Sequence, residues 1–346
     1  MGLMNIQQNI SLVTHSTMGV GGLAAYLAEV NDRMELLEAL SWAQTNNLQV
    51  IMIGNGSNIV WRDEGFAGLV IVDKILRFDI FEEDDTNVYL TIGGGEPWDS
   101  VVERSVAAGL TGIEAMSLIP GSTGATPIQN VGAYGQDIAS VLVSVEAYDT
   151  VDRDFVTIPV TDCELGYRTS RFKDTDRGRF FISAITLHLV KGNPQAPFYG
   201  AVQTYFETNN ITNFTPSALR TAVVAIRTSK LPDPKVVKNN GSFFANPIID
   251  EYRYNELAEQ YSLIPHWPQD DGKVKISAAW LIEQSGFKDY HDPETGMATW
   301  TSQPLVLVNE SATSTAKVLS FRDKISAAVK VKFNIELEQE PELLPR

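Results

Sequence analysis

The chain has 346 residues, 44% of them hydrophobic and 20% charged, which is the balance of a globular protein and a length that predicts two or three domains. Its formal net charge of −16 argues against nucleic acid or an anionic membrane as a partner. The single cysteine excludes an intrachain disulfide, and we find no membrane-spanning apolar run, signal peptide or myristoylation motif. We therefore expect a cytoplasmic protein.

The first elements expected are a helix and a strand. Apolar residues recur at helical spacing from 34 to 43, after Asp32, a residue typical of a helix N-cap. The apolar run at 48–53 predicts a buried strand. The stretch 19–24 fits the GxGxxA pattern of a dinucleotide-binding turn, but helical signals resume only at Asp32, which favours a simple glycine turn.

The next elements alternate strands with a helix. A strand at 88–92 ends in three glycines, and Pro97 then introduces a helix that Gly109 ends. Short strands separated by turns follow between 141 and 190. Seventeen of the 25 glycines lie in the first 135 residues, so we expect an α+β half in which loops bring the backbone close to a ligand.

A linker and a second region are expected after this half. Residues 191–214 are rich in Pro, Asn and Gln and predict a loop or linker. Thr215 and Pro216 then fit the N-cap and first residue of a helix that runs to Arg227. The remaining expected elements are an apolar helix near 276–284, a strand at 305–309 and a final helix around 318–329.

Two glycine-rich stretches are the strongest candidates for ligand binding. GNGSN at 54–58 follows a strand, and its free N–H groups would suit a pyrophosphate, although a plain tight turn has the same composition. PGSTGATPIQNVGAYG at 120–135 is long and would be costly to order without a ligand. Its small residues let the chain pass close to a flat cofactor, and its Gln, Asn and Tyr side chains offer hydrogen-bonding groups.

Arg168 and Ser242 are candidates for catalysis. Arg168 follows a strand, and a guanidinium stabilises developing negative charge because it is rigid and always ionised, although most arginines are paired surface residues. Ser242 follows an Asn-Gly pair, so it could be a turn residue. As a catalytic group, it could donate its proton only to a strongly basic carbanion or enolate in a water-poor site.

Charge is unevenly distributed in the last third of the chain. Between 221 and 246 the local charge is +3, from Arg227, Lys230, Lys235 and Lys238 against Asp233. This cluster suits an anionic small molecule. The tail carries Glu336, Glu338 and Glu340, which would share one face if the tail is a strand, although acidic tails are usually just solvated. Because the four histidines are scattered and cysteines are not clustered, no metal site is expected.

Five motifs taken together resemble one family, the UDP-N-acetylenolpyruvoylglucosamine reductases of peptidoglycan precursor synthesis. The motifs are GNGSN (54–58), IPGSTGATPIQNVGAYG (119–135), GYRTSRF (166–172), RTSKLPDPK (227–235) and NGSFFANP (240–247). Their order and spacing fit along nearly the whole chain, and the segment 197–200 looks like the tyrosine loop of the family's longer subtype.

The resemblance implies an α+β fold, in which a two-subdomain FAD-binding module of the vanillyl-alcohol-oxidase type precedes a C-terminal α+β substrate-binding domain. The implied boundaries are 1–72 and 73–214 for the FAD-binding subdomains, 215–332 for the substrate-binding domain, and 333–346 for a C-terminal strand that returns to the active site. It also implies non-covalent FAD, NADPH as co-substrate and a UDP-sugar substrate, and we expect a monomer.

Implied site residues fall into three sets. The FAD-binding set is Gly54, Asn55, Gly56, Ser57, Asn58, Pro120, Gly121, Ser122, Gly124, Ala125, Ile128, Gln129, Asn130, Gly132, Ala133, Tyr134 and Gly135. The substrate-binding set is Tyr199, Arg227, Lys230 and Asn246. The catalytic set is Arg168, Ser242 and Glu340.

The implied reaction is the NADPH-driven reduction of UDP-N-acetylglucosamine enolpyruvate to UDP-N-acetylmuramate. Arg168 and Glu340 would stabilise or polarise an enolate-like intermediate, and Ser242 would protonate it. The family's LExE unit matches 337–340 and points to Glu340, although a two-residue shift would select Glu338, and Pro341 departs from the family's usual sequence. The loop 287–303 departs as well. Two alternatives are a flavin oxidase on the same scaffold and a non-catalytic regulator that binds flavin or a nucleotide-sugar.

Overall fold

The computed structural model describes residues 5–346, so the expectations for the extreme N-terminus fall partly outside the described residues. By internal contacts the chain forms two compact units. Among the described residues, the first unit comprises 5–10, Ala24–Asn55 and Phe66–Ser229, and the second comprises Ser11–Leu23, Gly56–Gly65 and Lys230–Arg346.

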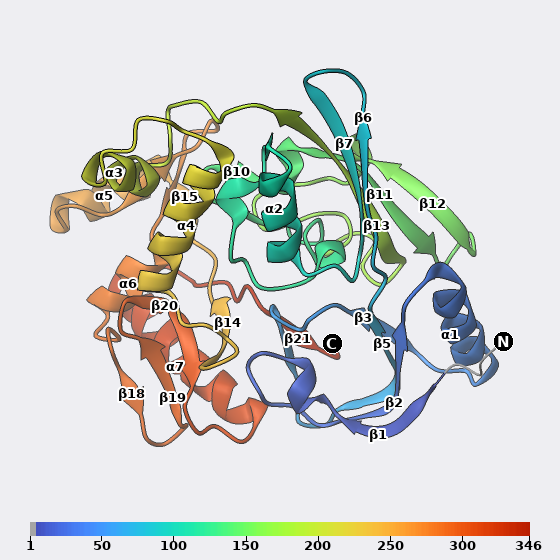
Figure 1. Ribbon diagram of the computed structural model, residues 1–346. Helices are drawn as coiled ribbons and strands as arrows, with labels where there is room; N and C mark the ends of the chain where they lie inside the picture. The colour runs from blue at the N-terminus through green and yellow to red at the C-terminus, as the bar shows by residue number, and fades with distance from the viewer. Residues whose placement is uncertain (1–4) are drawn as a thin grey trace. The chain divides into compact units, whose positions relative to one another are not determined.

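The first unit contains a four-stranded sheet with one helix against it (Figure 1). The elements are β1 (Gln7–Ser11), β2 (Leu23–Val30), α1 (Arg33–Thr45), β3 (Val50–Ile53) and β5 (Phe66–Asp73). The strand order is β1-β2-β5-β3, and β5 runs parallel to both β2 and β3. The carboxylate of Asp32 accepts the N–H of Glu35, and Leu36, Ala39 and Ala43 of α1 are buried. The expected helix and strand are confirmed, but only Ile53 of β3 is fully buried.

A second, antiparallel sheet of six strands completes the framework of this unit. Its order is β12-β11-β13-β7-β6, with β8 beside β13. The elements are β6 (Phe78–Glu82), β7 (Asn87–Gly93), α2 (Trp98–Ala107), β8 (Leu110–Thr111), β11 (Leu142–Asp149), β12 (Asp154–Pro159) and β13 (Phe180–Lys191). The side chains of Trp98, Val101 and Val102 pack α2 into the core of this sheet. The helix after Pro97 and the strands between 141 and 190 are confirmed.

Short elements lie between successive strands of this second sheet. They are the 3-10 helices η2 (Glu114–Met116), η3 (Thr123–Ala125), η4 (Ile138–Ser140) and η5 (Val160–Asp162), and the strands β9 (Gly132–Ala133) and β10 (Gln136–Asp137). The second glycine-rich stretch is therefore ordered as η3 followed by the β9–β10 hairpin.

Two helices pack together at the end of the first unit. They are α3 (Gly200–Thr208) and α4 (Pro216–Lys230), and Thr215 Oγ1 accepts the N–H of Ala218 as the expected N-cap. The expectation of a loop throughout 191–214 is wrong, because α3 lies inside it. Val202 and Phe206, one helical turn apart, pack with α4, and this short apolar face was concealed by the polar residues around it.

The second unit is built on two antiparallel sheets (Figure 1). Its elements are η1 (Leu12–His15), β4 (Ile59–Trp61), β14 (Lys238–Ser242), β15 (Ile248–Asp250), α5 (Glu251–Gln260), β16 (His266–Pro268), β17 (Lys273–Ile276), α6 (Ala278–Gln284), β18 (His291–Asp292), β19 (Met297–Trp300), β20 (Gln303–Asn309), α7 (Thr315–Phe333) and β21 (Glu342–Leu344). The sheet orders are β14-β20-β19-β18 and β15-β17-β16. Both α6 and α7 bury apolar side chains with Phe243 and Phe244 in one core, which confirms the expected helices.

The C-terminal segment forms a strand later than its alternating glutamates suggested. Helix α7 ends at Phe333, and its C-cap, Asn334, adopts a left-handed conformation with φ 53°. Gln339 makes an isolated bridge to Phe244, and the strand proper is β21, which runs parallel to β4. Pro341 separates the bridge from the strand, and it has no N–H to donate to a ladder.

The glycine turn at 19–22 leads into β2, so a strand follows it rather than the helix of a dinucleotide-binding motif. This finding confirms the simple-turn interpretation. The compact units also group the chain differently from the ligand-binding regions expected at 1–72, 73–214 and 215–332, since α4 to Ser229 belongs to the first unit. Those functional boundaries stay a prediction.

Candidate active site

In the first unit, the two glycine-rich candidate stretches meet at Gly54 and Asn55. A Cβ at Gly54 would overlap the Oγ of Ser122, and Asn55 Nδ2 donates to the carbonyl of Gly121 over 3.3 Å. The next residues of the motif, 56–58, belong to the second unit. The first two residues of GNGSN, Gly54 and Asn55, are therefore in direct contact with Gly121 and Ser122 of the second stretch.

A third glycine stretch, 93–95, supports the second one and was absent from the predicted site. The N–H of Gly124 donates to the carbonyl of Gly94 over 2.8 Å, and that of Thr123 donates to Glu96 over 2.9 Å. A Cβ at Gly124 would lie 3.0 Å from the Cα of Gly94. The sequence signal was present as three consecutive glycines after a strand, but their partner in space could not be identified from the pattern.

Gly94, Gly95 and Gly124 together form what we call the glycine layer. Asp73, at the end of β5, packs against Gly94 and Gly124 of this layer. It is 3% exposed, its Oδ1 accepts the N–H of Ile75 over 2.9 Å, and a Cβ added to Gly94 would overlap its Oδ2. Burial raises the pKa of Asp73 to about 7, against the opposing effects of the Ile75 hydrogen bond and the charge of Lys74. A titratable group thus lies directly against the backbone of the candidate binding loop.

The β9–β10 hairpin presents Tyr134 at its tip. Tyr134 and Gly135 have φ values of 49° and 87°, the left-handed conformations of a two-residue hairpin turn. The ring of Tyr134 meets that of Tyr199 edge-on at 5.6 Å. These two residues, predicted to bind different ligands, therefore lie side by side in the first unit.

Arg227 lies next to Tyr134 and to the loop before Pro120. Its Nη2 donates to the carbonyl of Leu118 over 3.2 Å, while its Nε is buried without a hydrogen-bond partner among the described residues. Burial lowers the pKa of the Arg227 guanidinium, with the neighbouring Tyr134 opposing the shift. Burial likewise raises the pKa of Tyr134, and Arg227 opposes that shift. A partly buried cation whose buried Nε is an unused donor is suited to an anionic ligand.

The structure packs Arg168 against the second glycine-rich stretch. Gly166 and Thr169 exchange backbone hydrogen bonds, so Arg168 lies in a tight turn and has a left-handed φ of 57°. Its guanidinium donates to the carbonyls of Asn130 and Gly132 over 3.5 and 3.4 Å. A strained, non-glycine residue held in this way is typical of functional sites.

Asn130 turns out to hold this turn in place. Its Nδ2 donates to the carbonyl of Gly166 over 3.1 Å, and its Oδ1 accepts the N–H of Ala139 over 3.0 Å. The side chain predicted to contact the cofactor therefore connects its own segment to the Arg168 turn.

In the second unit, Ser242 and Glu340 lie on neighbouring segments. The N–H of Glu340 donates to the carbonyl of Phe243 over 3.0 Å, and that of Ala245 donates to Glu338 over 3.0 Å. Glu338 is exposed, whereas Glu340 is partly buried. Of the two alternative glutamates, Glu340 is thus the one bonded to Phe243, the residue next to Ser242.

Lys230 and Asn246, the other predicted substrate-binding residues, also belong to the second unit. Lys230 is exposed, while the Oδ1 of Asn246 accepts the N–H of Ala278 at the start of α6 over 2.9 Å. This bond fixes the orientation of the Asn246 amide.

The remaining predicted FAD-binding residues follow the backbone of the same two stretches. Pro120, Ala125 and Gly135 are exposed, Gly56 is buried, and Ser57, Asn58, Ile128, Gln129 and Ala133 are partly buried. A glycine-lined surface of this kind, where added Cβ atoms would overlap neighbouring atoms, fits a flat group contacted mainly by backbone. FAD is such a group.

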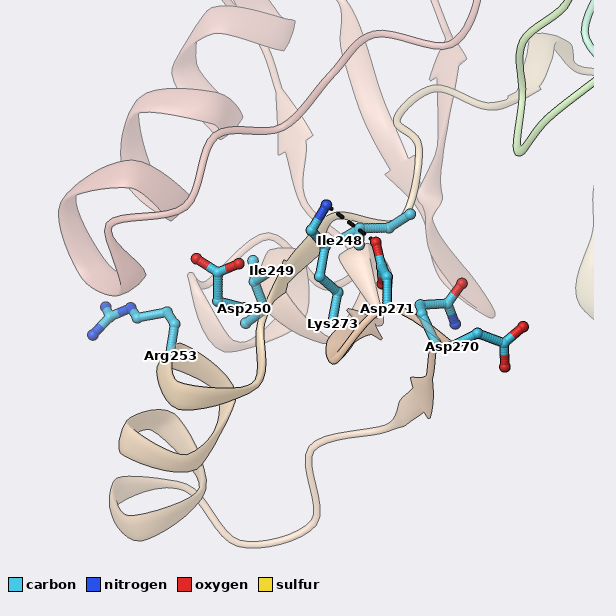
Figure 2. Close-up of a pocket in the computed structure, with 8 residues that line it drawn as sticks. Ile248, Ile249, Asp250, Arg253, Asp270, Asp271 and Lys273 are labelled. Carbon is cyan, nitrogen blue, oxygen red and sulfur yellow. Dashed lines mark ion pairs between the residues drawn. The ribbon is translucent and has the colours of Figure 1, made fainter. Parts of the chain in front are cut away.

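A hollow of about 650 Å³ lies elsewhere in the second unit (Figure 2). Its walls are Ile248, Ile249, Asp250, Arg253, Gln269, Asp270, Asp271 and Lys273. Figure 2 shows Lys273 beside Asp271, and the two form an ion pair of 3.2 Å. It contains none of the predicted site residues.

Within residues 5–346, no group of three or more His, Cys, Asp or Glu side chains is arranged to hold a metal ion. Over the same range, every helix is too short or too polar to span a bilayer.

Family models match both parts of the chain. Residues 24–154 match the FAD binding domain, and residues 233–344 match the UDP-N-acetylenolpyruvoylglucosamine reductase C-terminal domain. These matches confirm the expectation of an N-terminal FAD-binding module followed by a C-terminal domain.

Relatives extend the match over the whole chain. The UDP-N-acetylenolpyruvoylglucosamine reductase of Chromobacterium violaceum is 34% identical over 343 residues, covering 99% of this chain and 99% of its own. The enzyme of the same name from Alcanivorax borkumensis is 38% identical over 333 residues, covering 95% of this chain and 94% of its own. The structure of the Thermus caldophilus reductase superimposes with a TM-score of 0.69 at 22% identity, over 99% of this chain and all of that one, and confirms the α+β fold.

Proposed function

The chain belongs to the UDP-N-acetylenolpyruvoylglucosamine reductase family, and from this premise we propose which of its residues carry out the reaction. It is an FAD-dependent oxidoreductase that reduces UDP-N-acetylglucosamine enolpyruvate to UDP-N-acetylmuramate with NADPH, in the synthesis of peptidoglycan precursors. What carries the residue assignment is the Arg168 turn, which the backbone of Asn130 and Gly132 anchors to the glycine-rich stretch.

FAD, when bound, accepts hydride from NADPH and supplies hydride to the enolpyruvyl double bond. We assign its binding to 54–58 and 120–135, where glycines would allow the backbone to approach a flat ligand closely. Gly54 against Ser122 and Gly94 against Gly124 leave no room for larger residues, which supports this assignment.

Arg227, Lys230, Tyr199 and Asn246 are the residues assigned to the UDP-sugar. A diphosphate needs cations where it binds, and Arg227 and Lys230 belong to the +3 cluster of an otherwise acidic chain. The buried Nε of Arg227 has no acceptor among the described residues, which supports a ligand acceptor at this position.

Arg168 is assigned to the developing negative charge, Glu340 to the polarisation of the intermediate, and Ser242 to the proton. Hydride addition to one carbon of the double bond leaves an electron pair on the other, as an enolate conjugated with the substrate carboxylate. Arg168 stabilises that charge with a group that stays ionised. Ser242 Oγ donates its proton to the carbanionic carbon, and the resulting alkoxide regains a proton from solvent.

Glu340 is preferred over Glu338 as the catalytic carboxylate. Glu340 is partly buried and its N–H is bonded to Phe243, the neighbour of Ser242, whereas the side chain of Glu338 is exposed. A carboxylate that acts on an enolate must be shielded from water to have an effect.

We also propose that the protein is cytoplasmic and monomeric. A cytoplasmic location is supported by the reaction, because NADPH and nucleotide-sugars are cytoplasmic metabolites, and the product supplies the cell wall on which shape and division depend. We assign a monomer, which light scattering of the purified protein would report as a mass of 38.1 kDa.

The first experiment is an anaerobic absorption spectrum of the purified protein, before and after NADPH, and again after the enolpyruvyl sugar. We expect a flavin spectrum that bleaches with NADPH and recovers with the sugar. A colourless protein that takes up no added FAD would contradict the assigned binding segments. A spectrum that recovers only with oxygen would favour an oxidase.

The same assay with Ser242→Ala tests the proton donor. We expect normal reduction by NADPH and a loss of roughly 100-fold or more in the sugar-dependent step, the usual contribution of a general acid. Equal losses in both steps would make Ser242 a structural residue, and full turnover would remove it from the mechanism.

A further inference from the structure

Asn240 joins three segments of the second unit through one amide group. Its Nδ2 lies 3.0 Å from Thr17 Oγ1, 3.1 Å from Ser57 O and 3.2 Å from Ile59 O. These partners are at least 181 residues away in the sequence, and Asn240 is only 5% exposed. The hydrogen bonds are therefore shielded from water, where each has a larger effect on position.

The geometry requires a donor at this position. Three oxygens surround the Nδ2 atom, so only an NH₂ group suits them. The Oδ1 of Asn240 is buried and has no hydrogen-bond partner among the described residues. Buried acceptors are normally paired, and this one is not within residues 5–346. The hydrogen bonds that Asn240 makes there through its side chain therefore all come from its Nδ2 donor.

A β-bulge in β14 frees Asn240 to make these bonds. Asn239 lies opposite Val308 and Ser242 opposite Val306, so three steps along β14 correspond to two along β20. The N–H of Gly241, whose φ is 70°, donates to Asn239 Oδ1 over 2.8 Å. Bulges redirect side chains and occur next to active sites, and this one lies between Asn239 and Ser242, so that it includes Asn240.

The partner of Asn240, the turn at 56–59, is itself tightly held. The N–H of Thr17 donates to the carbonyl of Gly56 over 3.0 Å, and Ser16 Oγ donates to Ile59 over 2.6 Å. Gly56 has a left-handed φ of 69°, and a Cβ there would overlap the carbonyl of His15. The turn thus offers Asn240 a rigid attachment point.

We propose that Asn240 is a positioning residue that fixes the Ser242-bearing bulge to the turn at 56–58. It sets the place of the proton donor relative to the part of the glycine-rich motif assigned to FAD. This inference rests on the proposed roles of Ser242 and of 56–58. Its test distinguishes a failure of the inference from a failure of those proposed roles.

The test uses the FAD-loaded enzyme with Asn240→Ala, Asn240→Asp and Ser242→Ala. The matched control is Asn309→Ala, because Asn309 is 6% exposed and its Nδ2 also donates to two carbonyls, Met18 at 2.9 Å and Ala312 at 3.1 Å. Four quantities are measured: reduction by NADPH, reoxidation by the enolpyruvyl sugar, retained FAD, and hydrogen exchange of the amides at 56–59 and 240–243.

We expect both Asn240 variants to retain FAD and to be reduced by NADPH at a rate close to that of the parent. Reoxidation by the sugar should slow by roughly 100-fold, the effect of a small misplacement of a catalytic group. Asn240→Asp should be the slower variant, because a carboxylate would then face three oxygens. Hydrogen exchange at 56–59 and 240–243 should rise together in the Asn240 variants. Asn309→Ala should leave the ratio of the reduction rate to the reoxidation rate unchanged.

Two results would overturn the inference while Ser242→Ala still blocks reoxidation. One is an equal slowing of both half-reactions or loss of FAD in the Asn240 variants, since Asn240 would then only stabilise the fold. The other is an unchanged reoxidation rate. If Ser242→Ala itself reoxidises at full rate, the proton-donor assignment fails and the inference fails with it.

Discussion

The glycine layer of the first unit and the bulged strand of the second are built on opposite principles. In the first, Gly94, Gly95 and Gly124 present backbone, and the neighbouring atoms leave no space for a side chain. In the second, the proposed roles of Asn240 and Ser242 depend on their side chains, and both residues lie within the bulged segment of β14. A backbone surface is damaged by any added atom, whereas a side-chain site is damaged by loss of one chemical group.

The largest expected effect concerns Arg168, the side chain of the first unit to which we assign a catalytic role. Arg168→Lys should lower the rate of sugar reduction by roughly 100-fold to 1,000-fold with FAD retained, because lysine cannot reproduce the planar fork. Stopped-flow reoxidation by the enolpyruvyl sugar measures it. The matched control is Arg171→Lys in the same segment, where Arg171 is paired with Asp176 at 2.6 Å. Equal rates for the two variants would remove Arg168 from the mechanism and leave the first unit with only backbone contacts to the ligand.

The second prediction concerns which glutamate acts beside Ser242. Glu340→Gln should slow sugar reduction by roughly 100-fold, because it removes the carboxyl group that we propose polarises the intermediate in a partly buried site. Glu338→Gln should change the rate little, since that side chain is exposed. Steady-state turnover of the two variants decides between them. The reverse order would show that the family's LExE unit is shifted by two residues here.

A third, smaller effect tests the crowding of the glycine layer. In Gly95→Ala the new Cβ would lie 2.5 Å from the backbone N of Ile75 and 2.5 Å from the backbone C of Lys74. Because backbone cannot move aside easily, we expect a loss of about 2–3 kcal/mol in the free energy of unfolding, together with weaker FAD binding. Urea unfolding and FAD titration measure these.

Gly200→Ala is the control for this variant, because nothing lies within 4 Å of its added Cβ and its position is helical. It should keep or slightly raise stability. If both variants unfold at the parent's midpoint, the layer is not packed as tightly as its geometry indicates.

The smallest effect is the pH dependence carried by Asp73. Its folded-state pKa of about 7 lies above its ordinary value of 3.8, so the folded protein binds this proton more tightly than the unfolded chain. The stability that Asp73 contributes is therefore present at low pH and is lost as the pH rises through about 7. Between pH 6 and pH 8 we expect the parent to lose about 1 kcal/mol relative to Asp73→Asn.

Urea unfolding of both proteins at the two pH values checks this difference. Asp149→Asn is the control, because hydrogen bonds from Arg179 hold the pKa of Asp149 at about 2 and it stays ionised throughout the range. Its destabilisation should be the same at both pH values. Parallel curves for the parent and Asp73→Asn would show that burial does not shift the Asp73 titration.

Local sequence patterns determined the secondary structure and the family. Helix α1 with its Asp32 cap, α4 with its Thr215 cap, and the three strands between 141 and 190 follow from spacing and capping alone. The glycine-rich motifs were recognisable because glycine is required wherever the backbone itself must approach a neighbour. These signals lie within a few residues of one another, so they can be identified without knowing the fold.

Only the tertiary structure decided which distant residues meet. Asp73 under Gly94, Asn130 against the Arg168 turn, and Asn240 beside Ser57 each join segments far apart in the chain. The preference for Glu340 over Glu338 likewise depends on the neighbouring strand, since both fit a similar local pattern. Burial and hydrogen-bond partners arise from the packing of remote segments, and it is that packing which turns a common Asn or Asp into a positioning or titrating group.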